Sequence, residues 1–128
     1  MTPAKITGLV PILQTPFDST GLIDTEALRR VVDYNIEAGV DGLGIALASE
    51  VQLFNESERD QLLKTAVDQS NGRVPVVMNT GAIGTDLAVH YSRKAEELGA
   101  DAVMLTPPGS KVASGNPEVT KQYFRDIA

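Results

Sequence analysis

Residues 37–45, EAGVDGLGI, and residues 97–105, ELGADAVML, repeat one pattern sixty positions apart. Each copy reads as a helix end, a glycine that stops the helix, an aspartate and an apolar segment. An apolar segment that does not alternate with polar residues predicts a strand buried on both faces, which is typical of parallel sheets covered by helices. The repeat therefore predicts two βα units in every sixty residues.

Four apolar segments are bounded by Gly, Pro or Asp, and each is followed by a helix pattern. The predicted strands are residues 9–13, 43–47, 74–78 and 102–105. The first predicted helix follows Asp24 and ends at Gly39, and the second follows Asn55 and ends near residues 71–72. The third begins at Thr85 and ends at Gly99, and the fourth follows Asn116 with a proline at its first position. The chain is thus expected to contain four βα units.

The length of the chain leaves two architectures open. Eight such units would need about 250 residues, the usual size of a (β/α)8 barrel, so 128 residues would supply half of one. A four-stranded, doubly wound domain of the flavodoxin type fits the same length. The periodicity alone does not separate these two folds, but either would form a single domain over residues 1–128.

Composition and charge exclude several classes of function. The chain has 17 acidic and 11 basic residues, a formal charge of −6 and no Lys/Arg cluster, so nucleic acid is not an expected partner. It has no cysteine and a single histidine, His90, which argues against metal clusters and thiol nucleophiles. The N-terminal apolar segment is interrupted by Pro11 and is too short for a signal peptide or a membrane span, so we expect a cytoplasmic protein.

Ligands of parallel α/β folds gather at the carboxyl ends of the strands. The loops at these ends are residues 14–17, 48–50, 79–82 and 106–111. In the second loop, Ala48 and Ser49 could offer backbone N–H groups and a hydroxyl to a small carboxylate, although small residues after a strand also simply provide space. Glu50 is a candidate acid or base, or a group that orients backbone amides. Residues 80–85 lack the lysine of a phosphate-binding P-loop.

Several short segments occur in a characteristic order and spacing. They are Thr15-Pro16-Phe17, residues 37–42, Glu50, Glu58-Arg59, residues 74–76, Thr80-Gly81, residues 97–102 and Thr106-Pro107. In this order the chain resembles the dihydrodipicolinate synthase/N-acetylneuraminate lyase family. Members of that family are (β/α)8 barrels, usually homotetramers, in which a strand-borne lysine forms a Schiff base with an α-keto acid such as pyruvate. The resemblance favours the half-barrel over the doubly wound domain.

The resemblance also implies a site. Leu47, Ala48 and Ser49 would bind the substrate carboxylate, and the site would be lined by Thr15, Glu50, Thr80, Thr106 and Gly109. The chain departs from the family pattern in that Leu47 and Ala48 stand where the family has hydroxyl residues, Ser49 replaces a glycine and Gly109 replaces a tyrosine. These departures indicate an aldolase or dehydratase that has diverged in substrate. No metal or organic cofactor is implied, and the expected partners are a small α-keto acid and further copies of the chain.

The Schiff-base lysine is not expected within these residues. The lysines are Lys5, Lys64, Lys94, Lys111 and Lys121, and none falls in a predicted strand. A lyase whose complete form extends beyond this half-barrel is therefore the leading hypothesis. The alternatives are a catalytically inactive half-barrel that associates with itself or another chain, and a flavodoxin-like binding domain.

Overall fold

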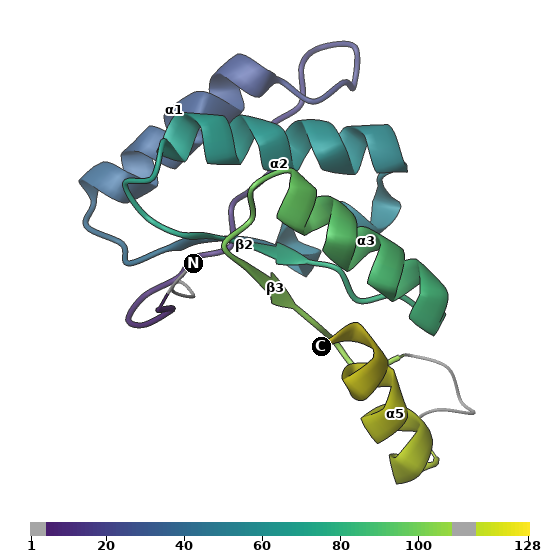
Figure 1. Ribbon diagram of the computed structural model, residues 1–128. Coiled ribbons are helices and arrows are strands. Elements are labelled where there is room, and N and C mark those ends of the chain that lie inside the picture. Colours follow the sequence, from purple (N-terminus) through teal and green to yellow (C-terminus); the bar gives the residue numbers. More distant parts are fainter. Residues whose placement is uncertain (1–4, 109–114) are drawn as a thin grey trace.

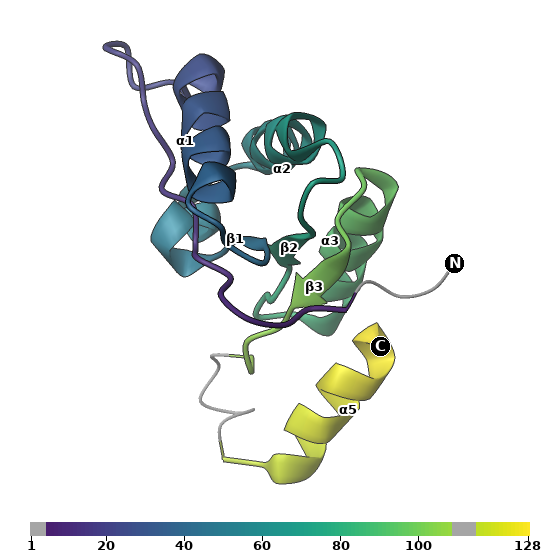
Figure 2. The same cartoon turned by 90° about the vertical axis from the view of Figure 1, so that its left-hand side faces the viewer.

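A computed structural model describes residues 5–108 and 115–128 (Figure 1). In chain order the elements are α1 (Thr25–Glu37), β1 (Leu43–Ile45), the short 3-10 helices η1 (Leu47–Ser49) and η2 (Val51–Leu53), α2 (Glu56–Ser70), β2 (Val76–Asn79), α3 (Thr85–Glu97), β3 (Ala102–Met104) and α5 (Pro117–Ile127). Viewed along a second direction, α1, α2 and α3 form an arc outside the three strands (Figure 2). All four predicted helices and three of the four predicted strands are therefore present.

The three strands are parallel and lie in chain order, β1-β2-β3. Residues 9–13 run beside β1 but form only a single bridge, between Ile12 and Gly44, so the prediction of a regular strand there was wrong. The backbone groups of Leu9, Pro11 and Leu13 face β1, and Pro11 has no N–H to donate to it. The consecutive order contradicts the flavodoxin type, because there the first strand lies inside the sheet.

An aspartate before β1 and another before β3 each pair reciprocally with the preceding strand segment; we call these pairings the aspartate braces. Asp41 donates its N–H to the Leu9 carbonyl at 2.9 Å, and its Oδ2 accepts the Leu9 N–H at 2.7 Å. Asp101 does the same with Val76, at 2.9 Å and 2.8 Å. The sixty-residue repeat thus produces the same pairing twice. Each aspartate accepts the first N–H of one strand segment and places the following strand beside that segment.

The core lies between the sheet and its outer helices. Its buried members include Leu28 and Val32 of α1, Leu62, Leu63 and Ala66 of α2, and Leu43, Ile45, Val76 and Met78 of the strands. Because side chains alternate along a strand, Gly44, Val77 and Asn79 face the opposite, inner side. A Cβ on Gly44 would lie 2.5 Å from Ile12 Cδ1, so the glycine leaves room for the isoleucine on that side.

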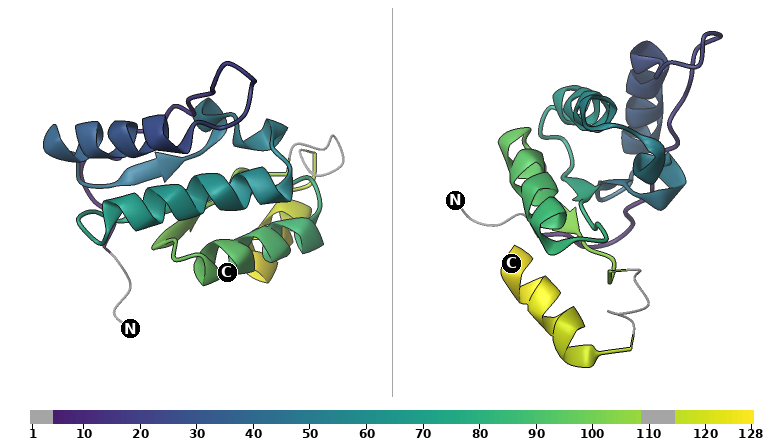
Figure 3. Two further views of the ribbon diagram at one scale, coloured as in Figure 1. Left: turned by 90° about the horizontal axis from the view of Figure 1, so that it is seen from above. Right: turned by 90° about the vertical axis from the view of Figure 1, so that its right-hand side faces the viewer.

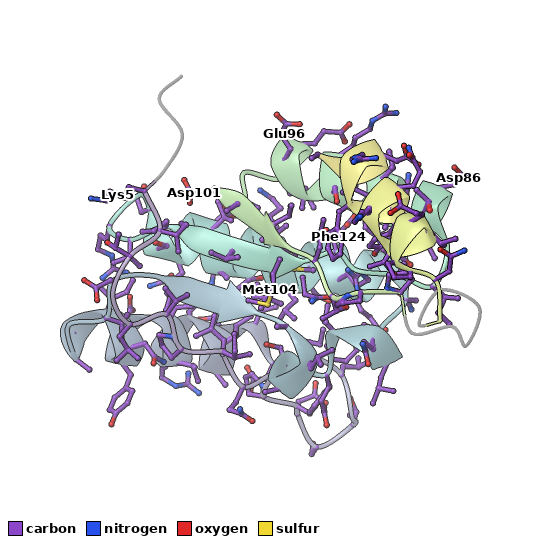
Figure 4. The ribbon with its side chains drawn as sticks, turned by 90° about the horizontal axis from the view of Figure 1, so that it is seen from below. Lys5, Asp86, Glu96, Asp101, Met104 and Phe124 are labelled. Carbon is purple, nitrogen blue, oxygen red and sulfur yellow. The ribbon has the colours of Figure 1, made fainter. Side chains whose placement is uncertain are left out.

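The inner face of the sheet is only partly covered. Met104 lies on the same face as Asn79, its partner in the register, and is 36% exposed. Figure 4 views the sheet from the side away from α1 and α2 and shows Met104 on it. At the end of the chain, α5 packs beside α3 (Figure 3), and the Tyr123 hydroxyl accepts the Ala82 N–H at 3.2 Å.

The helix starts follow the predicted capping chemistry with one exception. Asp24 accepts the Ala27 N–H at 2.8 Å, and Asn55 and Glu58 form a reciprocal capping box. Asn116 accepts the Glu118 N–H at 3.0 Å ahead of Pro117. The third helix is preceded by Gly84 without a side-chain cap, and Thr85 is its first residue.

Replacing Asp101 with Ala should lower the free energy of unfolding by about 1–2 kcal/mol, because the Val76 N–H at the start of β2 loses its acceptor. Asp101→Asn keeps an acceptor oxygen and should lose less. Urea unfolding followed by far-UV circular dichroism measures both, with the exposed Asp126→Ala as control. Equal stability of the Ala variant and the unmodified chain would contradict the role given to the brace.

Candidate functional site

The loop after β1 is fixed by Ser49, which is fully buried. Its hydroxyl donates to the Leu13 carbonyl at 2.5 Å and accepts the Ala46 N–H at 3.2 Å. Its own N–H donates to the Ala46 carbonyl at 2.9 Å, and its carbonyl accepts the Thr15 hydroxyl at 2.6 Å. The structure therefore brings Thr15 and Ser49 together. The hydroxyl, N–H and carbonyl of Ser49 are all hydrogen-bonded to other groups of the protein.

Leu47 and Ala48 present the unoccupied donors of this loop. They begin η1, and the first N–H groups of a helix have no acceptor within it. Within residues 5–108 and 115–128, neither N–H has an acceptor. Leu47 is 52% exposed, so this part of the loop is accessible.

Glu50 has a left-handed backbone, with φ 61° and ψ 21°. This conformation is uncommon for residues other than glycine and separates η1 from η2. The Glu50 N–H donates to the Leu47 carbonyl, and its carbonyl accepts the Leu53 N–H, each at 2.9 Å. The Glu50 residue is exposed, and its backbone shapes the loop.

The loops after β2 and β3 meet closely. Thr80 is fully buried, and its hydroxyl shares a hydrogen bond of 2.8 Å with that of Ser92 on α3. A Cβ on Gly81 would lie 2.5 Å from Thr106 Oγ1 and 3.0 Å from its backbone nitrogen, so Gly81 permits this approach. Thr80 and Thr106 therefore occupy adjacent loops, whereas Gly109 lies outside the described residues.

Two polar residues near these loops, Arg59 and Asn79, fall in segments that the sequence analysis named, but neither was predicted as a site residue. Arg59 is only 6% exposed, donates to the Val51 and Asn79 carbonyls at 2.9 Å each, and lies over the Tyr91 ring at 4.2 Å from its centroid. Burial lowers the pKa of the Arg59 guanidinium from its ordinary value, an effect opposed by Tyr91 and by nearby carboxylates. The signal was its spacing of three, four and seven residues from Leu62, Leu63 and Ala66 on the buried stripe of α2.

Asn79 is the second of these residues. It is 1% exposed on the inner face, and among residues 5–108 and 115–128 neither its Oδ1 nor its Nδ2 has a hydrogen-bond partner. Buried polar atoms are rarely left unpaired, because each costs about 1–3 kcal/mol. A polar residue ending an otherwise apolar strand segment was the signal that could have identified it.

A cavity of about 440 Å³ lies outside the carboxyl ends of β2 and β3. Its walls include Phe54, Arg59, Gly81, Leu87, Tyr91 and Thr106. Among the described residues, no group of three His, Asp or Glu side chains is placed to hold a metal ion. None of the described helices has the length and apolar character needed to cross a membrane.

Parallel strands in chain order, outer helices and polar loops at the carboxyl ends define the first half of a (β/α)8 barrel. More particularly, the chain belongs to the Dihydrodipicolinate synthetase family, whose profile matches residues 5–128. This match confirms the family that the order of sequence segments indicated.

Named relatives support the same family. The chain is 40% identical over 122 residues to a 4-hydroxy-tetrahydrodipicolinate synthase of Pelobacter propionicus, covering 94% of this chain and 41% of that protein. It is also 40% identical over 102 residues to an L-2-keto-3-deoxyarabonate dehydratase of Azospirillum brasilense, covering 79% of this chain and 33% of the relative. The chain therefore spans less than half the length of these relatives.

A solved structure shows the same partial coverage. YagE, a prophage protein of the dihydrodipicolinic acid synthase family from E. coli K12 in complex with pyruvate, superposes with a TM-score of 0.88 at 31% identity. The superposition covers 98% of this chain and 42% of YagE. The half-barrel fold is thus found within complete members of the family.

Substitutions of two buried polar residues should have different effects on stability. Ser49→Ala should lower the free energy of unfolding by about 1–3 kcal/mol, because it leaves the Leu13 carbonyl and Ala46 N–H unpaired. Asn79→Leu should be neutral or stabilising by up to about 1 kcal/mol, because it removes two unpaired atoms. Thermal and urea unfolding measure both changes, and strong destabilisation by Asn79→Leu would show that its amide has a partner.

Proposed function

We propose that the chain is the N-terminal half of a lyase that acts on a pyruvate-like α-keto acid through a Schiff base. The observation that carries this proposal is the family match over residues 5–128. The open N–H groups of the loop after β1 support it, because by the resemblance we take this loop as the carboxylate-binding segment. The related dehydratase and the pyruvate complex of YagE support the same class of substrate.

In the proposed site, the Leu47 and Ala48 N–H groups hold the substrate carboxylate. Backbone N–H groups that point into one concavity bind anions without a charged side chain. Ser49 acts by fixing the loop, since its hydroxyl bonds Leu13 and its carbonyl accepts from Thr15. Glu50, Thr80, Thr106 and Gly109 line the site in this proposal.

The attacking amine would come from a lysine on a strand beyond this chain. Its nitrogen would add to the C2 carbonyl of the keto acid and release water, leaving an imine that stabilises a carbanion. Lys64, Lys94 and Lys121 lie on helices and form ion pairs with Asp68, Asp60 and Glu118, respectively. None of the described strands carries a lysine.

The departures at Leu47, Ala48 and Gly109 favour a divergent aldolase or dehydratase over a true dihydrodipicolinate synthase. An apolar Leu47 cannot relay a proton, so the chemistry would need another acid or base. The similarity to an L-2-keto-3-deoxyarabonate dehydratase supports this preference. We place the enzyme in the cytoplasm, which suits a chain without cysteine.

The 128-residue chain should form no covalent adduct with pyruvate, because no described strand supplies a desolvated lysine. Incubation with pyruvate and sodium borohydride, followed by intact-mass measurement, tests this. A barrel that continues this sequence through a strand-borne lysine should give one adduct per chain under the same conditions. A stoichiometric adduct on the 128-residue chain, or none on the longer protein, would contradict the proposal.

The second candidate, a self-associating half-barrel, is favoured by the incompletely covered inner face around Met104. Covering a few hundred Å² of apolar surface at about 25 cal/mol per Å² is worth several kcal/mol, which supports pairing with a second copy. Light scattering at micromolar concentration should therefore give a mass of at least twice 13.6 kDa. A monodisperse, folded monomer would contradict this assembly.

A further inference from the structure

We propose that Arg59 is a positioning residue that holds the loop after β1 and the end of β2 at a fixed separation; the consequence for catalysis rests on the proposed function. Its Nη1 donates to the Val51 carbonyl and its Nη2 to the Asn79 carbonyl, both at 2.9 Å. Val51 directly follows Glu50, and Asn79 directly precedes Thr80. One side chain of α2 therefore joins two loops that carry candidate site residues.

The remaining hydrogen bonds of the first loop do not provide this connection. Ser49 ties the loop to Leu13, and Thr15 binds the Ser49 carbonyl, so both anchor it to the N-terminal segment. Across residues 5–108 and 115–128, the bonds made by Arg59 are the hydrogen-bonded link between residues 47–53 and β2. Without them, the first loop would keep its tie to the N-terminal segment, and its connection to β2 would be the β1–β2 ladder, which ends at the Ile45–Met78 pair.

The environment of Arg59 indicates that this position needs a side chain that donates hydrogen bonds. The residue is buried, and no carboxylate of the described chain lies within 4.0 Å of its guanidinium. Asp60 and Glu56 act on it only from further away. Burying a cation without a carboxylate in direct contact is unfavourable, and a leucine or methionine would fill the same space without that cost. An apolar side chain, however, could not bond two carbonyls. The Tyr91 ring at 4.2 Å offsets part of the cost by a cation–π interaction.

The geometry requires an arginine rather than any cation. A guanidinium is planar and presents donors on two separate nitrogens, so it can reach two carbonyls at once and still lie flat on a ring. A lysine ammonium at the same place is a single point charge on a flexible stem. Arg59→Lys should therefore keep one loop attached and release the other, whereas Arg59→Met should release both.

Amide hydrogen exchange of the purified 128-residue chain tests this proposal without any turnover. In Arg59→Met, the Glu50 and Leu53 amides of the first loop and the Thr80 amide at the end of β2 should exchange about tenfold faster. The Leu28 amide of α1 and the Leu98 amide after α3 should be unchanged. In Arg59→Lys, one of the two loops should return to the exchange rate of the unmodified chain. Arg93→Met, the same change at an exposed arginine, is the matched control and should alter none of these rates.

The alternatives give different patterns. Faster exchange throughout the chain in Arg59→Met and Arg59→Lys alike would show a general role in stability and overturn the proposal, as would unchanged exchange in both loops. If Arg59→Met fails to fold, Arg59→Lys alone decides, because protection restored in one loop only supports the link and uniform loss rejects it. Because exchange needs no substrate, failure of borohydride trapping in the longer barrel would reject the proposed function and leave this result standing.

Discussion

The reciprocal pairing of an aspartate with the start of the preceding strand is the interaction on which the rest of the structure depends. Asp41 with Leu9 and Asp101 with Val76 each satisfy a donor at the edge where strands enter the sheet. Each brace also places the following strand in register with its neighbour. Since alignment is provided at the amino ends, the loops at the carboxyl ends are free to carry polar groups and unusual backbone conformations such as that of Glu50.

The hydrogen-bonding state of each polar group separates scaffold from site. Ser49, Thr80 and Arg59 are buried with their polar groups bonded, so they hold loops together. The Leu47 and Ala48 N–H groups lack acceptors in the described chain and lie at an exposed turn, as a ligand-binding segment requires. Asn79 belongs to neither group, because its amide is buried on the inner face without a partner in the described part of the chain.

The sequence predicted the elements better than it predicted their side-chain partners. Apolar segments, helix caps and the repeat located the helices and three strands, because these signals act over a few residues. Residues 9–13 form a single bridge at Ile12 and not a full strand, because Pro11 lacks a donor N–H. The proline was visible in the sequence, but the prediction gave more weight to the apolar pattern. The partners of Arg59 are eight and twenty positions away, so their proximity follows from packing that no local pattern specifies. The 3-10 turn at Leu47 likewise ended the second predicted strand at Ile45.

The consecutive order of the strands has a consequence for how the chain acquires its shape. Every sheet partner is the nearest strand in sequence, and the two braces join residues only 32 and 25 positions apart. Each closure spans a single βα unit, so its entropy cost does not grow as further units are added. A chain emerging from the ribosome could therefore dock each βα unit on the previous one before the next is synthesised, so that growth of the sheet follows the direction of translation.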